Sequence, residues 1–288
     1  MFTGAFVALV TPFKNGKVDE KKFRSLVEFQ IKNGIDGIVP CGCTGEAATL
    51  NAAEQKRLIK ITVETAARRV PVVAGTGSNS TSEAIDLTVA AKKAGCDGAL
   101  IITPYYNKPT PEGQYRHYKT IAKAADIPIM LYNVPSRTGI SLLPGTVARL
   151  SKIDNIVAIK EAAGSLQQVV DILSCCGITV LSGDDSMTLP FMSVGALGVV
   201  SVAANIIPGR VQDLTSSYLK GDHERSRKIH YEITELCRTL FIETNPIPVK
   251  TALSLMKMVS EEWRMPLCEM TRQNRDKLKV VLKKYKLI

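Results

Sequence analysis

Short apolar runs rich in valine, isoleucine and alanine recur roughly every 25 to 35 residues along the first three quarters of the chain. Each run is followed by polar or glycine-rich residues and then by a stretch in which apolar residues return at helical spacing. The runs comprise residues 5–10, 37–40, 72–74, 99–102, 129–131, 156–160, 179–181 and 198–202. This pattern predicts eight strands, each followed by a helix.

Eight strand-then-helix units predict the α/β class and a (β/α)8 TIM barrel. Nearly continuous apolar strands are typical of a parallel sheet that helices cover. After about residue 224 only helical patterns remain: an apolar stripe, a second helix from Pro248 to Met256 and a third after Thr271. The stripe consists of Ile229, Ile233, Leu236 and Leu240. We therefore predict a catalytic barrel over residues 1–224 and a small all-helical appendage over residues 225–288.

Several expected helices begin with the residue spacing of a capping box. The candidate pairs are Asn51 with Glu54, Ser80 with Glu83, and Ser165 with Gln168. In each pair the first side chain is expected to accept a hydrogen bond from the backbone of the second residue.

Charge and hydropathy argue against two classes of partner. The chain of 288 residues carries a net charge of +10, but its lysines and arginines are spread over helical stretches, with the densest run at 272–286. Since no basic segment alternates with aromatic residues, we expect no nucleic-acid partner. A charge-free run at 186–209 contains glycines, prolines and Asn205, so we expect a short helix and a buried strand there and no membrane span.

Cysteine usage favours the cytoplasm. The seven cysteines include Cys41-x-Cys43 and the adjacent pair Cys175-Cys176, without the spacing of a zinc site or of a secreted disulfide framework. With three histidines, a metal site is not expected either. Residues 1–5 lack the basic residues of a signal peptide. We expect reduced thiols and no metal.

Lys160 is the main candidate for chemistry because it ends the apolar run 156–160. In a TIM barrel, residues at this end of a strand face the active site. Burial there favours loss of the ammonium proton, and the resulting amine forms Schiff bases with carbonyl compounds. Tyr132, which ends the preceding strand, is the candidate proton shuttle. The alternatives are a solvent-facing edge lysine and a tyrosine with a purely structural role.

A keto-acid substrate would also bring a carboxylate. The backbone N–H groups and hydroxyl of Cys43-Thr44-Gly45 are candidates to bind it, and glycine permits close approach. Arg137 is a candidate to bind a second carboxylate in bidentate fashion, with a loop salt bridge as the alternative.

These residues lie in motifs that resemble the 4-hydroxy-tetrahydrodipicolinate synthase family, also called dihydrodipicolinate synthase. The motifs are Gly42-Cys43-Thr44-Gly45-Glu46, Pro104-Tyr105-Tyr106-Asn107, the segment 131–139 with Tyr132 and Arg137, Ile159-Lys160-Glu161, Ser182-Gly183-Asp184-Asp185 and Asn245-Pro246-Ile247-Pro248-Val249-Lys250. The resemblance covers essentially the whole chain. It implies a class I, lysine-dependent aldol condensation of pyruvate with aspartate-4-semialdehyde, in lysine and diaminopimelate synthesis. It also implies a covalent imine in place of a cofactor, and a homotetramer built from tight dimers.

The resemblance also implies individual roles. Lys160 forms the imine with pyruvate, and Tyr132 works in a proton relay with Tyr106 of a neighbouring subunit. The expected substrate-binding residues are Thr44, Gly45, Arg137, Gly183 and Val200, with Thr44 holding the pyruvate carboxylate, Arg137 the semialdehyde carboxylate, and the Val200 carbonyl near the lysine.

The chain departs from the family at two places. Cys43 stands where the relay normally has a threonine, so we expect a slower relay or a water in its place, since a thiol is a weak donor. Asn79, Glu83 and Tyr105 match the family's regulatory lysine pocket. Its usual histidines are replaced by Ala52 and Gln55 and its serine by Ala47, so we expect weak or absent inhibition by lysine.

Two other functions are compatible with a barrel-mouth lysine. A sister aldolase, such as an N-acetylneuraminate or keto-deoxy-sugar lyase, would keep Lys160 and Tyr132 but need a larger pocket, and Arg137 argues against it. A non-catalytic barrel that binds a keto acid as a sensor would be marked by the altered relay at Cys43.

Overall fold

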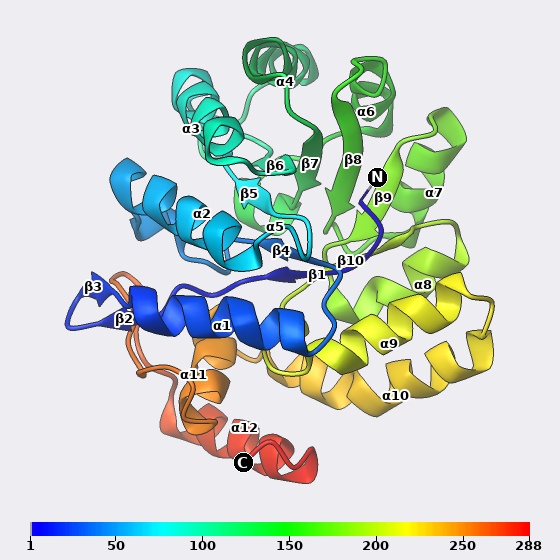
Figure 1. Ribbon diagram of the computed structural model, residues 1–288. Coiled ribbons are helices and arrows are strands. Elements are labelled where there is room, and N and C mark those ends of the chain that lie inside the picture. Colours follow the sequence, from blue (N-terminus) through cyan, green and yellow to red (C-terminus); the bar gives the residue numbers. More distant parts are fainter. Residues whose placement is uncertain (1) are drawn as a thin grey trace.

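The computed structural model describes residues 2–288 and forms a ring of strands enclosed by helices (Figure 1). Met1, part of the segment in which a signal peptide was considered, lies outside the described residues. The barrel strands are β1 (Gly4–Ala8), β4 (Gly37–Val39), β5 (Val73–Gly75), β6 (Gly98–Ile102), β7 (Ile129–Asn133), β8 (Ile156–Glu161), β9 (Thr179–Ser182) and β10 (Gly198–Ser201). A short hairpin, β2 (Phe13–Lys14) with β3 (Lys17–Val18), follows β1.

Helices separate the barrel strands, and further helices follow them. The α-helices are α1 (Glu20–Lys32), α2 (Ala52–Ala66), α3 (Thr81–Ala94), α4 (Pro111–Ala125), α5 (Pro135–Thr138), α6 (Pro144–Leu150), α7 (Leu166–Cys175), α8 (Thr188–Ser193), α9 (Pro208–Leu219), α10 (His223–Thr239), α11 (Ile247–Leu255) and α12 (Arg272–Lys284). Single 3-10 turns are η1 (Ala47–Thr49), η2 (Asp185–Met187) and η3 (Ala203–Asn205).

The strands pair in parallel in the order β4-β1-β10-β9-β8-β7-β6-β5. The two end strands meet through a parallel bridge between Ile38 and Val72, which closes the ring. The predicted (β/α)8 barrel is therefore confirmed, and each predicted strand matches an observed one to within two residues at either end. The hairpin was not predicted, because strands of two residues are too short to show an apolar alternation.

Large side chains fill the inside of the ring, so the barrel is a packed core. Its buried cluster includes Phe6, Val39, Met130, Ala158, Leu181 and Val200. Glycine makes room for the largest of these: a methyl group on Gly37 would collide with the Phe6 ring. The cavity lined by barrel residues lies at the C-terminal ends of the strands.

Two of the three predicted helix starts form side-chain caps. Asn51 and Glu54 make both hydrogen bonds of a capping box at α2. Ser165 accepts from Gln168 N at α7. The expected cap at Ser80 is wrong: Ser80 makes no cap bond, and Glu83 accepts instead from the Ser78 hydroxyl at 2.8 Å. A nearby serine thus competes for the carboxylate.

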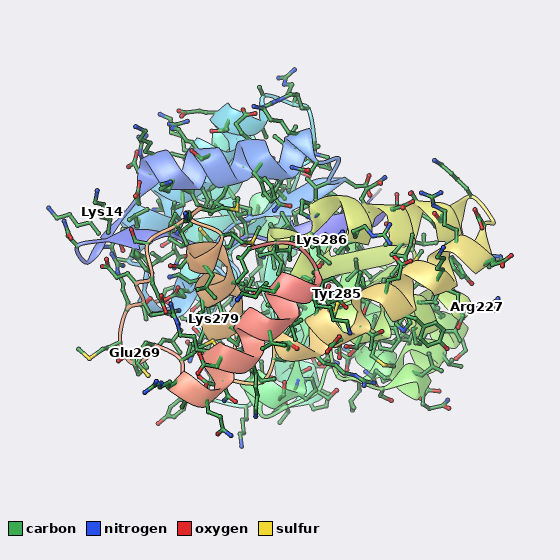
Figure 2. The ribbon with its side chains drawn as sticks, turned by 90° about the horizontal axis from the view of Figure 1, so that it is seen from below. Lys14, Arg227, Glu269, Lys279, Tyr285 and Lys286 are labelled. Atoms are coloured by element: carbon green, nitrogen blue, oxygen red, sulfur yellow. The ribbon has the colours of Figure 1, made fainter. Side chains whose placement is uncertain are left out.

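The C-terminal helices extend the barrel core. The predicted apolar stripe on α10 is buried and belongs to one cluster with residues of β1 and of α11 and α12. The predicted boundary at 224/225 lies two residues inside α10, which packs against α9. Figure 2 shows α12 crossing in front of α11 and α10, with Tyr285 at its C-terminal end. Tyr285 donates a hydrogen bond to the Glu232 carbonyl of α10.

The charge-free run at 186–209 folds as expected into α8 and β10, with short turns at either side. None of the helices in the described part of the chain has the length and apolar character needed to cross a bilayer. All seven cysteines are free. On the face shown in Figure 2, Lys14, Arg227 and Lys279 lie on different elements and at separate points, as the spread of basic residues in the sequence predicts.

Candidate active site

Lys160 lies on β8 with its side chain only 5% exposed. The register of the sheet places Tyr132 of β7 directly beside it. The Lys160 Nζ lies 4.2 Å from the centroid of the Tyr132 ring. The alternative of a solvent-facing lysine is therefore wrong.

Burial lowers the pKa of Lys160 to about 8 from its usual value of 10.5. The negative charges of Cys43 and Asp185 in their ionised forms oppose this change, and the Arg137 guanidinium adds to it. Among the described residues no carboxylate forms an ion pair with Lys160, so desolvation is not offset by a direct partner. A substantial fraction of this amine is neutral near pH 8 and able to act as a nucleophile.

Gly183 makes room for the Lys160 side chain. A methyl group at Gly183 would lie 2.9 Å from Lys160 Cε and 2.6 Å from Ala162 Cβ. The Gly183 N–H donates to the Glu161 carbonyl at 2.7 Å, which fixes this close approach. Gly183 is thus found at the predicted site, where its contact is with the lysine stem.

Thr44 lies on the turn that follows β4 and is 3% exposed. Its Oγ1 accepts a hydrogen bond from Asn245 Nδ2 at 3.0 Å. The Gly45 N–H donates to the Gly42 carbonyl. Within the described part of the chain, the N–H groups of Cys43 and Thr44 donate no hydrogen bond to another backbone group.

Tyr132 is buried, and burial raises its pKa well above the usual value of 10. The neighbouring Cys43 thiol raises the pKa further, while Arg137 lowers it. Tyr132 is therefore protonated at neutral pH and is suited to donate a proton or pass one on. Cys43 is half-buried beside it.

Arg137 lies on α5, the short helix after β7, and its side chain reaches the rim of the same cavity. Its Nη2 donates to the Asn245 carbonyl at 2.9 Å. Within residues 2–288 no carboxylate pairs with it, so the alternative of a loop salt bridge is wrong and most of its donors stay available for a ligand.

These side chains surround a cavity of about 420 Å³ at the C-terminal ends of the strands. Its lining includes Thr44, Tyr132, Arg137, Lys160, Gly183 and Asn245. Val200 is buried with Tyr132 in the cluster beneath it. Tyr106 is 89% exposed and does not line the cavity of its own chain.

Of the three residues matched to a regulatory pocket, Asn79 and Tyr105 lie on loops and Glu83 lies in the first turn of α3. Asn107 Nδ2 donates to the Asn79 carbonyl at 2.9 Å, which joins the loop before α3 to the loop of Tyr105. Gln55, which replaces a histidine, donates instead to the carbonyls of Ala47 and Leu50. Its amide is thus engaged within its own chain.

Two buried carboxylates and one amide near the site were given no role from the sequence. Asp185 accepts from Ser201 and from the backbone of Val202 and Ala203, and so fixes the turn after β10. Glu161 accepts from Asn133 at 3.0 Å, and burial raises its pKa to about 7. Asn245 is hydrogen-bonded to both Thr44 and Arg137. The signal in the sequence that could have identified it is its place in the family motif at residues 245–250.

A second hollow of about 600 Å³ lies between α9, α10 and α12. Its charged side chains pair with each other, Arg210 with Glu232 and Lys284 with Glu235. It offers no unpaired nucleophile comparable to Lys160. The described residues contain no group of three or more His, Cys, Asp or Glu able to hold a metal ion.

We expect Gly183→Ala to displace the Lys160 side chain, because the added methyl group cannot fit beside Cε. A misplacement of this kind lowers the rate of covalent capture by about 10²-fold. The measurement is borohydride trapping with pyruvate followed by intact mass. Gly145→Ala, where a methyl group meets no atom within 4 Å, is the matched control. Equal trapping by both variants would contradict the packing argument.

The sequence and the fold were compared with those of known proteins. The dihydrodipicolinate synthetase family matches residues 1–285. A 4-hydroxy-tetrahydrodipicolinate synthase of Geobacter sulfurreducens is 58% identical, with full coverage of both chains. The dihydrodipicolinate synthase structure from Aquifex aeolicus superposes with a TM-score of 0.98 at 50% identity, covering 99% of each chain. A chloride-inhibited dihydrodipicolinate synthase from Acinetobacter baumannii, complexed with pyruvate, has a TM-score of 0.98 at 44% identity with full coverage of both. The chain therefore belongs to the dihydrodipicolinate synthetase family.

Proposed function

We propose that this protein is a 4-hydroxy-tetrahydrodipicolinate synthase, which condenses pyruvate with L-aspartate-4-semialdehyde in lysine and diaminopimelate biosynthesis. The observation that carries the proposal is the buried, unpaired Lys160 amine over the Tyr132 ring, at the end of a barrel strand. Full-length relatives that carry this name support the choice of substrates.

The chemistry begins with the neutral Lys160 amine attacking the pyruvate keto carbon. A carbon–nitrogen bond forms and water leaves, giving an imine. Loss of a methyl proton gives an enamine, whose carbon attacks the semialdehyde carbonyl and forms the new carbon–carbon bond. The amino group of the former semialdehyde then attacks the imine carbon, closes the ring and releases Lys160. One water leaves overall, and no redox cofactor is required.

The neighbouring side chains supply proton transfer and carboxylate binding. Tyr132, protonated at neutral pH, relays protons to and from the carbinolamine oxygen and the aldehyde oxygen. Thr44 binds the pyruvate carboxylate, and Arg137 binds the carboxylate of the semialdehyde. The family resemblance adds the expectation that the Val200 carbonyl lies near Lys160.

The proposal includes a cytoplasmic homotetramer. The free cysteines fit a reducing compartment. Tyr106 is exposed on its own chain, as expected for a side chain that completes the relay of a neighbouring subunit. Light scattering of the purified protein measures the assembly directly.

A sister aldolase acting on sugar acids is the second candidate. It is favoured only by the shared lysine and tyrosine. The unpaired Arg137 guanidinium at the cavity rim favours a short, carboxylate-bearing aldehyde. A coupled assay that compares aspartate semialdehyde with sugar acids separates the two, and borohydride trapping alongside it separates both from a non-catalytic sensor.

The rate of imine formation should rise with pH and level off above about 8. Only the neutral amine attacks, and the pKa of Lys160 is about 8 rather than 10.5, so the neutral fraction grows through this range. Tyr132 adds no further ionisation in this range because its pKa is raised well above 10. Borohydride quenching of single turnovers between pH 6 and 10 tests this. A rate still rising at pH 10 would show that the lysine is not desolvated in the working enzyme.

We expect Arg137→Ala to raise the KM for aspartate semialdehyde by about 10- to 100-fold, the usual effect of losing a hydrogen bond to a charged group. Lys160 should still trap pyruvate, with the pH profile of trapping displaced toward higher pH, because the Arg137 guanidinium contributes to lowering the pKa of Lys160. Steady-state kinetics with each substrate varied in turn provide the test. Arg116→Ala, which removes an exposed arginine paired with Glu112, is the control.

Cys43→Thr should retain or raise turnover. The replacement supplies a stronger hydrogen-bond donor next to Tyr132 at nearly the same side-chain size. Turnover number with saturating substrates is the readout, and Cys268→Thr at an exposed position is the control. A collapse of activity confined to the Cys43 variant would assign the thiol a role of its own.

A further inference from the structure

The C-terminal helical segment contacts the active-site cavity through Asn245, which is 6% exposed. Its side-chain Nδ2 donates to Thr44 Oγ1 at 3.0 Å. Its backbone carbonyl accepts from Arg137 Nη2 at 2.9 Å. One residue between α10 and α11 thus touches both side chains that bind substrate carboxylates in the proposed function.

The direction of the hydrogen bond to Thr44 determines what Thr44 can do for a ligand. A hydroxyl has one proton and two acceptor lone pairs. Because the Asn245 amide nitrogen only donates, Thr44 Oγ1 acts as acceptor toward it and keeps its own proton free. A carboxylate only accepts, so this arrangement turns Thr44 into a donor for it.

The opposite orientation of the amide would have the reverse effect. With Oδ1 facing Thr44, the hydroxyl proton would be used by Asn245 and two acceptors would face the incoming carboxylate. In the observed orientation, Asn245 Oδ1 is buried without a partner among the described residues. The Asn245 side chain thus makes its hydrogen bond through Nδ2 alone.

A buried ion pair holds the same two segments together. Lys250 of α11, which is fully buried, pairs with Glu46, two residues after Thr44. The Lys250 Nζ also lies 4.3 Å from the centroid of the Phe13 ring. The turn after β4 is thus attached to the C-terminal segment at two points, through Thr44 and through Glu46.

We propose that Asn245 is a positioning residue, which orients the Thr44 hydroxyl as a hydrogen-bond donor to the carboxylate of the keto-acid substrate. The proposal rests on the proposed function, because it needs pyruvate to bind at Thr44. The Lys250–Glu46 ion pair holds the segment of Asn245 against the turn of Thr44. The C-terminal helices therefore contribute to substrate binding in their own chain.

The first test is steady-state kinetics of Asn245→Ala and of the nearly isosteric Asn245→Asp. We expect the alanine variant to raise the KM for pyruvate about tenfold with little change in kcat, since Lys160 is untouched. The aspartate variant should raise it about 100-fold or more, because it accepts the Thr44 proton and adds a negative charge. The KM for the semialdehyde should change little, since the backbone carbonyl that holds Arg137 remains.

A double-mutant cycle distinguishes orientation from general packing. In a Thr44→Val background the hydroxyl is absent, so Asn245→Ala should no longer change the KM for pyruvate. Multiplied effects of the two substitutions would overturn the proposal. Asn274→Ala, which removes an amide bonded to Glu243 in the same helical segment, is the control and should leave both KM values unchanged.

Borohydride trapping with pyruvate on the wild-type protein separates this proposal from the proposed function. If the wild type traps no pyruvate, both fail together. If it traps pyruvate and both Asn245 variants keep a normal KM, only the role of Asn245 is overturned. The near-isosteric aspartate variant answers the question if the alanine variant does not fold.

Discussion

The active site depends on a difference between two buried lysines, of which one is paired with a carboxylate and the other is not. Lys250 is fully buried and pairs with Glu46, so its charge is compensated. Lys160 is 5% exposed, and no carboxylate among the described residues pairs with it. Burial lowers the pKa of both amines and nearby negative groups oppose that change in both, but only Lys250 has a carboxylate in ion-pair contact. One lysine is therefore a structural cation and the other a nucleophile.

Keeping Lys160 unpaired requires a particular set of neighbours. The face of the Tyr132 ring covers its amine, and the absence of a side chain at Gly183 leaves room for its stem. The acidic groups nearby are directed elsewhere: Glu161 is hydrogen-bonded to Asn133, and Asp185 to the turn after β10. Glu161 follows Lys160 directly on β8 and therefore points to the opposite face of the sheet, so of the two only Asp185 acts electrostatically on the Lys160 amine. The polar network thus protects the reactivity of the lysine as well as fixing the strand ends.

The barrel and its central pair could be predicted because their signals are local. An apolar run that ends in Lys160 and a neighbouring run that ends in Tyr132 define two strand ends, and parallel pairing brings them side by side. The cap predicted at Ser80 is absent because Ser78 binds the Glu83 carboxylate, a competition that the Ser80–Glu83 spacing alone does not reveal. Asn245 and Lys250 are 201 and 204 residues from their partners. Lys250 lies within the apolar sequence of α11, which indicates that it needs a buried acidic partner but does not identify that partner.

These long-range contacts make the C-terminal helical segment part of the active site. A boundary near residue 224 separates strand-forming from helical sequence, but the buried cluster of β1 continues into α10, α11 and α12. The segment also supplies Asn245 and Lys250 to the turn that carries Thr44. A barrel without these helices would retain Lys160 and Tyr132, yet Glu46 would be a buried carboxylate without its cation and Thr44 would lose its donor. The helical appendage therefore completes the site, and the chemistry assigned to the barrel depends on the packing of α10, α11 and α12 against it.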